Sequence, residues 1–261
     1  MQLAGKVAIV TGSSRGIGKD IALAFAAEGS DIVVAARSET APDPRLPGTI
    51  YETAQAVESL GRRALAVKTD VTNEEDVAAM VNRTLETFGR IDILVNNAGV
   101  LVPRGILELP TRHLDLHYRV NLKGPILCMR AVLPTMLKQG QGWIINISSV
   151  AAKFPGPGPY SGVPPTRAFM YAATKAALER LSQALAVEYH AQGISVNVLS
   201  PAGRVRTPGN VFGMTPAGGT PEPFEKAEAM EKAAVFIASQ LPRSYTGHIV
   251  FDQELIDQHH L

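Results

Sequence analysis

Residues 6–27 read KVAIVTGSSRGIGKDIALAFAA, and this stretch decides the fold. The apolar run 7–10 is typical of a strand buried on both faces, and it ends at Thr11 and Gly12. A helical spacing of apolar residues begins at Ile17. The order of strand, glycine-rich turn and helix predicts a dinucleotide-binding unit, in which a pyrophosphate lies on the unpaired amides at the positive end of the helix.

The glycines of this turn, Gly12, Gly16 and Gly18, would let the backbone approach a pyrophosphate closely. Their spacing is G-x-x-x-G-x-G, which differs from the G-x-G-x-x-G of other dinucleotide-binding loops. A tight loop without a ligand would use the same residue types. Because strand and helix patterns alternate along the whole chain, we expect an α/β fold. It would be a single Rossmann-type, doubly wound domain over residues 1–261, with a mostly parallel seven-stranded sheet flanked by helices.

The composition is that of an ordinary soluble chain. It has 261 residues, 46% hydrophobic and 19% charged, which is enough to bury one large core. The net charge of +1 gives no electrostatic reason to expect a nucleic acid or an anionic membrane as partner. Cys128 is the one cysteine, which fits a reducing compartment. With no apolar run of about 18 residues and no room for a signal peptide before the first strand, we expect a cytoplasmic protein.

The end of the predicted strand 31–36 indicates which nucleotide is bound. A carboxylate there would accept the ribose hydroxyls of NAD, but Ala36 and Arg37 occupy these positions. Arg15 in the glycine loop offers a second guanidinium, and two arginines could clamp a 2'-phosphate. We therefore favour NADP(H) over NAD(H), the alternative being that both arginines are simply solvated. Arg45, in the proline-rich loop 38–49, could join this clamp or belong to an ordinary surface insertion.

Tyr171 and Lys175 lie four residues apart at the start of a predicted helix and so share one face. A free tyrosine, with a pKa of about 10, is a poor base, but a neighbouring ammonium and an oxidised nicotinamide favour the phenolate. Lowering the pKa of the tyrosine hydroxyl by about three units requires roughly 4 kcal/mol of stabilisation of the phenolate. Tyr171 would then be the general acid in reduction and the general base in oxidation. A serine after the predicted strand 143–147, Ser148 or Ser149, could hold the substrate oxygen.

Three motifs occur in a characteristic order, TGSSRGIG at 11–18, NNAG at 96–99 and Tyr-x-x-x-Lys at 171–175. On these motifs the chain is identified as a member of the short-chain dehydrogenase/reductase family. The resemblance implies an oxidoreductase that transfers a hydride between a nicotinamide and a ketone, aldehyde or secondary alcohol, and that forms a homodimer or homotetramer. The stretches 42–54 and 245–256 are similar to a subgroup that includes hydroxysteroid dehydrogenase-like proteins.

The resemblance also implies site residues. Asn121 is similar to the family's catalytic asparagine on a kinked helix, and Ser149 stands at the usual offset from it, with Ser148 as the alternative. The expected catalytic residues are Asn121, Ser149, Tyr171 and Lys175. The expected cofactor contacts are Gly12, Ser14, Arg15, Gly16, Ile17, Gly18, Arg37, Asp70, Val71, Asn97, Ala98, Gly99, Tyr171, Lys175, Ala202, Val205 and Thr207. Asp70 or Thr72 could equally be the N-cap of a helix that begins near residue 73, and NNAG could be an ordinary turn.

The chain departs from the family pattern in its loops. The interval from serine to tyrosine is longer than usual, and the extra residues lie in 154–166, where prolines and glycines predict a loop that shapes the substrate pocket. Tyr160 in this loop is rejected as the catalytic tyrosine because Pro164 stands where the lysine is required. The second predicted substrate loop, 204–223, is either a lid or a plain flexible loop.

Two further departures from the family pattern lie toward the C-terminal end of the sequence. Ala202 separates the Pro and Gly of the usual nicotinamide motif, so Val205 and Thr207 are one place out of register. The chain continues after its last strand with Asp-Gln-Glu at 252–254 instead of the usual Asp-Gly-Gly, so its tail should pack differently.

His113 and His117 lie four residues apart on the predicted helix 111–122 and could face one metal ion. No glutamate follows His113 and no third ligand is evident, so we expect exposed histidines and no metal.

Two other classes of function are compatible with the fold. A nucleotide-binding protein without turnover would keep TGSSRGIG and would not need the proton-transfer residues. An epimerase or dehydratase would usually require a larger C-terminal substrate domain than this chain can supply.

Overall fold

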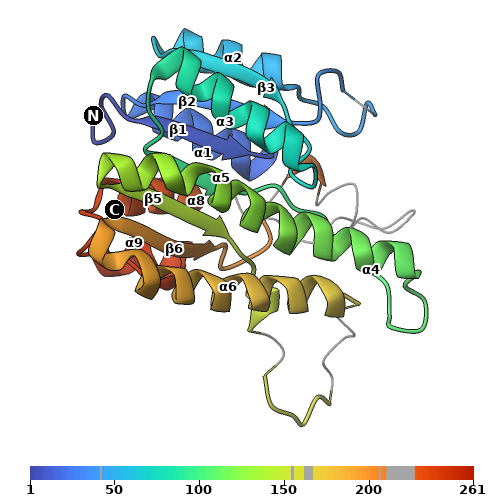
Figure 1. Ribbon diagram of the computed structural model, residues 1–261. Coiled ribbons are helices and arrows are strands. Elements are labelled where there is room, and N and C mark those ends of the chain that lie inside the picture. Colours follow the sequence, from blue (N-terminus) through green and yellow to red (C-terminus); the bar gives the residue numbers. More distant parts are fainter. Residues whose placement is uncertain (42, 154–155, 162–166, 206, 210–226) are drawn as a thin grey trace.

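The computed structural model describes residues 1–41, 43–153, 156–161, 167–205, 207–209 and 227–261. Within them, seven strands form one sheet in the order β3-β2-β1-β4-β5-β6-β7, and every paired neighbour is parallel (Figure 1). The strands are β1 (Val7–Thr11), β2 (Asp31–Ala36), β3 (Ala64–Lys68), β4 (Ile93–Asn96), β5 (Gly142–Ile147), β6 (Ile194–Ser200) and β7 (Ile249–Phe251). The predicted doubly wound α/β fold is therefore confirmed.

Helices cover both faces of the sheet (Figure 1). Apolar residues of α1 (Gly16–Ala27), α2 (Ile50–Ser59), α8 (Glu228–Ser239) and α9 (Asp252–His259) share one core cluster. Those of α3 (Glu74–Phe88), α5 (Gly124–Gln139) and α6 (Phe169–Tyr189) share the other. From β1 the chain adds β2 and β3 on one side of the sheet and then β4 to β7 on the other, so the strand order reverses between β1 and β4. This class of fold binds its ligands at that reversal.

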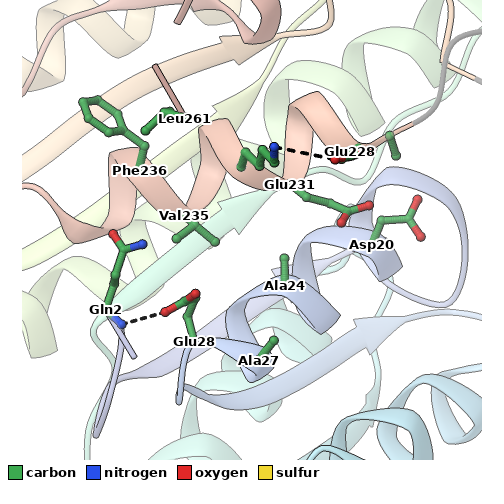
Figure 2. Close-up of a pocket in the computed structure, with 12 residues that line it drawn as sticks. Gln2, Asp20, Ala24, Ala27, Glu28, Glu228, Glu231, Val235, Phe236 and Leu261 are labelled. Carbon is green, nitrogen blue, oxygen red and sulfur yellow. Dashed lines mark hydrogen bonds and ion pairs between the residues drawn. The ribbon is translucent and has the colours of Figure 1, made fainter. Parts of the chain in front are cut away.

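A cavity of about 940 Å³ lies between α1 and α8 (Figure 2). Its lining contains the carboxylates of Asp20, Glu28, Glu228 and Glu231. Burial raises the pKa of Glu231, and the charges of Asp20 and Glu228 raise it further. None of the residues predicted to contact cofactor or substrate lines this cavity.

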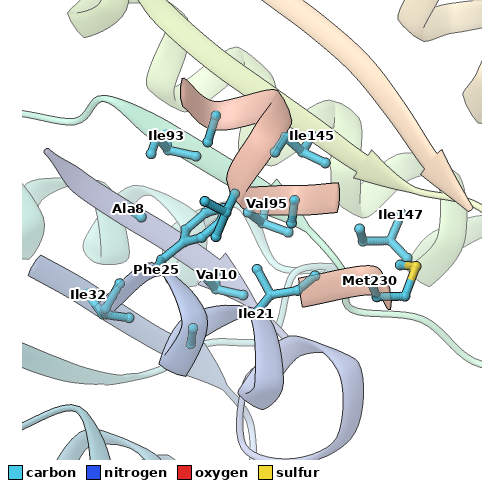
Figure 3. Close-up of a cluster of buried hydrophobic side chains, with 14 of the residues drawn as sticks. Ala8, Val10, Ile21, Phe25, Ile32, Ile93, Val95, Ile145, Ile147 and Met230 are labelled. Carbon is cyan, nitrogen blue, oxygen red and sulfur yellow. The ribbon is translucent and has the colours of Figure 1, made fainter. Parts of the chain in front are cut away.

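The core on the α1 side shows why these segments form buried strands. Val10, Val95 and Ile145 come from adjacent strands, and Phe25 of α1 packs over them (Figure 3). All four side chains are fully buried. Each such burial contributes about 1.5–3 kcal/mol of transfer free energy, and a continuous apolar run is what a strand covered on both faces requires.

The N-terminus of α3 differs from the predicted cap. The Asn73 side chain caps the helix, because its Oδ1 accepts hydrogen bonds from the amides of Glu75 and Asp76. Asp70 instead accepts a hydrogen bond of 2.9 Å from the Thr72 amide. The expectation that Asp70 or Thr72 caps α3 is therefore wrong, since an asparagine one residue closer to the helix fills this position.

The predicted helix 111–122 is not one regular helix. It consists of α4 (Thr111–Tyr118) and a π-helical turn, η1 (Arg119–Lys123), which leads directly into α5. Pro125 stands in the first turn of α5 and has no amide hydrogen to donate to the preceding turn, which explains the local widening of the helix. The kink that the family resemblance implies at Asn121 thus takes the form of a π-helical turn that contains this residue.

Two short helical segments lie between the main elements. They are η2 (Val150–Ala152) after β5 and η3 (His190–Gln192) after α6. The residues after β7 form α9, which packs on α8 through the rings of His259 and Phe236, 4.3 Å apart. No helix in the described ranges is both long and apolar enough to cross a membrane.

The turn between β1 and α1 is packed against the end of β4. Gly12 has a φ of +68°, and a Cβ on it would lie 2.8 Å from the Cα of Ala98. A Cβ on Gly18 would lie 2.3 Å from the Nδ2 of Asn97 and 2.7 Å from the carbonyl oxygen of Gly12. The glycines at positions 12 and 18 are therefore required by the packing of this turn against the end of β4, apart from any role in binding a ligand.

We expect Gly18→Ala to lower the free energy of unfolding by about 1–3 kcal/mol, because the added methyl group must displace Asn97. The gain in helix propensity of up to about 1 kcal/mol would offset only part of this cost. Urea denaturation measures the change. Gly105→Ala is the matched control, since a Cβ there meets no atom within 4 Å. Equal stabilities of the two variants would contradict the packing argument.

Candidate active site

Tyr171 and Lys175 lie in the first turns of α6, beside the end of β5. The Nζ of Lys175 is 5.7 Å from the centroid of the Tyr171 ring and donates a hydrogen bond of 2.7 Å to the Ile147 carbonyl. The Ser149 hydroxyl also interacts with the Tyr171 phenol and lowers the pKa of Tyr171. The structure therefore brings a phenol, an ammonium group and a serine together at the carboxyl end of a central strand.

Burial dominates the electrostatics of this group. Desolvation lowers the pKa of Lys175 to about 8, and the charge of Glu179 opposes the shift. Desolvation also raises the pKa of Tyr171, while the hydrogen bond with Ser149 lowers it. The net direction for Tyr171 is opposite to the expected one, because the loss of hydration outweighs the local contacts. A shift toward phenolate therefore requires a further positive charge beside the ring, such as that of an oxidised nicotinamide.

Ser148 and Ser149 have different partners. Ser148 is buried, and its Oγ donates a hydrogen bond of 2.7 Å to the Oε1 of Glu179. Ser149 contacts Tyr171 and accepts a hydrogen bond of 3.2 Å from the amide of Ala151. The arrangement favours Ser149 over Ser148 as the residue beside the phenol. Glu179 was missed by the sequence argument, although its position one turn after Lys175 was a usable signal.

Asn121 is buried in η1 and holds the segment that follows NNAG. Its Oδ1 accepts a hydrogen bond from the Val100 amide at 2.8 Å, and its Nδ2 donates to the Val100 carbonyl at 2.9 Å and to Thr174 at 3.3 Å. A Cβ on Gly99 would lie 3.5 Å from the Oδ1 of Asn121 and 3.8 Å from the Nζ of Lys175. Gly99 thus lies where η1 and α6 meet.

The two histidines of α4 do not form a metal site. His117 is fully buried, which corrects the expectation that both histidines are exposed. Its Nδ1 donates to the His113 carbonyl at 2.6 Å, and its Nε2 accepts from the Val102 amide at 3.1 Å. Both ring nitrogens are therefore used by the backbone. Across the ranges the structure describes, no three metal-binding side chains of His, Cys, Asp or Glu are grouped.

The glycine loop and NNAG are hydrogen-bonded to each other. The Nδ2 of Asn97 donates to the carbonyls of Thr11 and Gly12 at 2.9 and 3.2 Å. The Oγ1 of Thr11 accepts hydrogen bonds from the amides of Asn97 and Ala98. The Asn97 side chain is thus engaged in holding the two loops together, which leaves the backbone of this segment to face a ligand.

Comparison with known proteins identifies the family. The family model described as short chain dehydrogenase matches residues 6–211. The chain belongs to the short-chain dehydrogenase/reductase family. The members of this family are oxidoreductases that use nicotinamide cofactors.

Individual relatives agree with this assignment. The chain is 35% identical over 260 residues to hydroxysteroid dehydrogenase-like protein 2 of Homo sapiens, and the match covers 98% of this chain and 59% of the relative. A crystal structure of a candidate dehydrogenase from Xanthomonas campestris superposes with a TM-score of 0.87 at 33% identity, covering 100% of this chain and 92% of that one. A short chain dehydrogenase homolog from Mycobacterium thermoresistibile gives 0.84 at 31%, with coverages of 99% and 89%. The subgroup resemblance is confirmed, and the chain spans about three fifths of the human relative.

The N-terminus of α1 fits the pyrophosphate of the family's cofactor. Arg15 is the N-cap residue, its side chain does not cap the helix, and no acidic residue stands in the first turn. The first amides of α1 therefore have no side-chain acceptor, and no carboxylate opposes a phosphate there. Ser14 is buried in the turn and Ile17 is partly buried in the first turn of α1.

Arg15 and Arg37 occupy different environments in this chain. The Arg15 guanidinium donates to the carbonyls of Pro47 and Gly48 at 3.0 and 2.9 Å and to the Ser38 hydroxyl at 3.1 Å, so it holds the loop after β2. Burial lowers the pKa of Arg15. Arg37 is exposed at the end of β2, and among the described residues no hydrogen bond or ion pair engages its guanidinium.

Two other charged residues near β2 are paired. Arg45 forms a bidentate contact with Asp43, which lowers the pKa of Asp43 to about 2. This pairing argues against the guess that Arg45 joins a phosphate clamp. Glu39 contacts Lys68 at 2.9 Å and accepts a hydrogen bond from Tyr51, and these contacts lower the pKa of Glu39.

The remaining predicted cofactor contacts follow β3 and β6. Val71 is buried beside Gly124, since a Cβ added to Gly124 would lie 2.8 Å from the Cγ2 of Val71. Val205 is also buried. The Ala202 amide donates to the Oδ1 of Asp252 at 2.7 Å. A Cβ on Gly16 would lie 3.1 Å from the Cβ of Thr207, so the segment after β6 approaches the glycine loop.

The two predicted substrate loops lie partly outside the described residues. Positions 154–155 and 162–166 of the first loop and positions 206 and 210–226 of the second are among those not described. Tyr160 is exposed and donates a hydrogen bond of 2.7 Å to the Gly156 carbonyl. Its position agrees with its rejection as the catalytic tyrosine.

The buried charge of Lys175 predicts a pH-dependent stability. The folded-state pKa is about 8, below the ordinary value of 10.5. Between these values the unfolded chain binds more protons than the folded chain, so wild-type stability rises with pH in this window. We expect the melting temperature of the wild type, relative to Lys175→Met, to increase between about pH 7 and about pH 9.5. Thermal melts of both proteins at the two pH values measure this.

Lys138→Met is the control, because Lys138 is exposed on α5. Its melting temperature relative to the wild type should not change in this way between the two pH values. A constant difference between wild type and Lys175→Met would show that burial of the Lys175 charge is not costly.

Proposed function

We propose that this chain catalyses NADP(H)-dependent hydride transfer between the nicotinamide and a ketone, aldehyde or secondary alcohol, with Tyr171 as the general acid or base. One observation carries the proposal. The Lys175 ammonium lies 5.7 Å from the Tyr171 ring, beside Gly99 of NNAG, and Ser149 interacts with the Tyr171 phenol and lowers its pKa. A scaffold that only bound a nucleotide would have no need of this grouping.

Each residue has a defined task in this proposal. Ser149 donates a hydrogen bond to the substrate oxygen and stabilises the negative charge that develops there. Tyr171 delivers a proton to that oxygen in reduction and removes it in oxidation. Lys175 favours the phenolate form of Tyr171, while Asn121 holds the backbone at Val100 and thus the position of Gly99. The nicotinamide, when bound, supplies or accepts the hydride.

The protonation state of Lys175 supports this division of labour. A pKa of about 8 leaves Lys175 mainly charged at neutral pH, so its ammonium can act on the phenol. The same value is close enough to neutrality for small changes in environment to alter the charge. The rate of alcohol oxidation would therefore rise with pH as Tyr171 deprotonates and then depend on the charge of Lys175.

The preference for NADP(H) rests on the charges at the end of β2. Arg37 is exposed there, and Arg15 donates a hydrogen bond to Ser38, the residue that follows Arg37. Two carboxylates of the loop after β2 are paired, Glu39 with Lys68 and Asp43 with Arg45. A 2'-phosphate would meet positive charge at this position, and a planar guanidinium can bind its oxygens bidentately.

Tyr171→Phe removes the proton donor and leaves the ring. We expect kcat to fall by about 10²- to 10⁴-fold, as is typical for loss of a general acid or base. The measurement is NADPH consumption with a panel of ketones and the reverse reaction with secondary alcohols, including steroid, terpenoid and acyl examples. Steroids belong in the panel because a relative is named hydroxysteroid dehydrogenase-like protein 2.

Tyr160→Phe is the matched control, since Tyr160 is the exposed tyrosine of the neighbouring loop. It should retain wild-type turnover. Near wild-type activity of Tyr171→Phe would refute the assigned role of Tyr171. Binding of NADPH without consumption on any substrate would favour the alternative, a catalytically silent nucleotide-binding protein.

Arg37→Ala tests the cofactor preference. Loss of a charge-assisted contact to the 2'-phosphate should lower the ratio of kcat/KM for NADPH over NADH by about tenfold or more. Arg45→Ala should leave the ratio unchanged, because Arg45 is paired with Asp43. A wild-type enzyme that uses NADH as well as NADPH would contradict the preference itself.

The homodimer or homotetramer expected for the family and the cytoplasmic location stay predictions.

A further inference from the structure

Three residues spaced by one helical turn on α6 contact three successive positions at the end of β5. Each contact joins a side chain of the helix to a different position of the strand end. The pairs are Tyr171 with Ser149, Lys175 with the carbonyl of Ile147, and Glu179 with Ser148. The first two pairs belong to the proposed catalytic group. The third pair has no task in the proposed mechanism, and yet it lies on the same helical face.

The carboxylate of Glu179 is held in place by Ser148. The hydrogen bond from the Ser148 Oγ is 2.7 Å long, and the exposed fraction of Ser148 is 3%. Ser148 also donates its backbone amide to Leu199 of β6, at 2.9 Å, so the serine itself is fixed in the sheet. This contact holds the Glu179 carboxylate at a fixed position relative to the end of β5.

That neighbour is Lys175. Its exposed fraction is 3%, and the carbonyl that it contacts is uncharged. Desolvation opposes the charged form of Lys175, and Glu179 is the residue whose charge favours it. A carboxylate near a buried ammonium offsets part of the cost of burial.

The elements packed against this part of α6 carry other charged or titratable groups, but their contacts lie elsewhere. Lys153, after η2, lies over the ring of Phe251 at 4.2 Å. His117 of α4 is bonded to backbone groups at both nitrogens. Arg119 of η1 donates to the hydroxyl of Thr72. The carboxylate of α4, Asp115, is exposed, whereas Glu179 is the group whose charge acts on the buried Lys175.

We infer that Glu179 is a positioning residue of this site, whose Ser148-anchored carboxylate keeps the Lys175 ammonium charged beside Tyr171. The effect of Glu179 on catalysis rests on the proposed function, whereas its effect on the charge of Lys175 does not. The effect reaches the substrate through two side chains, since Glu179 acts on Lys175 and Lys175 acts on the phenol. Glu179 lies two helical turns from Tyr171, so its direct repulsion of a phenolate is weaker than its effect through Lys175.

The first experiment measures the charge of Lys175 without any substrate. Protein labelled with ¹³C at the lysine ε-carbons is titrated by NMR, and Lys175→Met identifies the resonance. In Glu179→Gln, which keeps the size and an oxygen acceptor for Ser148, the midpoint of Lys175 should fall by about half a unit to one unit. Glu188→Gln, on the exposed side of the same helix, should leave it unchanged.

Ser148→Ala provides a second variant if Glu179→Gln folds poorly. It keeps the carboxylate but removes its anchor, so the midpoint of Lys175 should move in the same direction by a smaller amount. A midpoint that is unchanged in both variants would overturn the inference. If both variants only lost thermal stability, Glu179 would be a structural residue of α6.

The second experiment connects the charge to turnover. In alcohol oxidation, Glu179→Gln should move the pH at which kcat/KM falls, through loss of the Lys175 charge, to a lower value. At about pH 7, where much of Lys175 is charged in both proteins, the loss should be less than about twofold, and near pH 8 it should be about two- to fivefold, because the lower midpoint removes more of the charge there. A uniform loss at every pH would contradict the inference. If the NMR midpoint shifts but no substrate is turned over, the proposed function fails while the coupling of Glu179 to Lys175 stands.

Discussion

The arrangement of the site depends on the burial of the Lys175 ammonium group. Removing this charge from water lowers its pKa to about 8, and the Ile147 carbonyl and the Glu179 carboxylate recover part of the lost hydration. Because these contacts join α6 to the carboxyl end of β5, they also determine where the first turn of α6 lies. The interaction of Ser149 with the Tyr171 phenol is a consequence of the same packing.

The glycine loop and the candidate catalytic group are parts of one packed unit. Asn97 bonds the end of β4 to the glycine loop, which requires glycine at position 18. Two residues further on, Gly99 lies between Asn121 and Lys175, so the same short segment touches both halves of the site. The reversal of strand order between β1 and β4 explains this, since it leaves the ends of adjacent strands open for loops to meet.

Local patterns in the sequence were sufficient to predict the strands, the order of elements and the pairing of Tyr171 with Lys175. These features depend on residues close together in the chain, such as the apolar run of β1. What could not be predicted depends on contacts between distant segments. The burial of His117 requires the Val102 amide, and the anchoring of Glu179 requires Ser148 on another element. The π-helical turn at Asn121 had a local cause in Pro125, but its exact form depends on the packing of α5.

Of the two arginines proposed to bind the nucleotide phosphate, Arg15 also has a structural task. Arg15 donates to neutral carbonyls of the loop after β2, and such acceptors leave its charge uncompensated. The charge of Glu39 is meanwhile offset by Lys68. The field at the end of β2 therefore stays positive although Arg15 is engaged, and the exposed Arg37 can provide the direct contact. A loop held by one arginine and a phosphate held by the other are compatible, because the two interactions use different guanidinium groups.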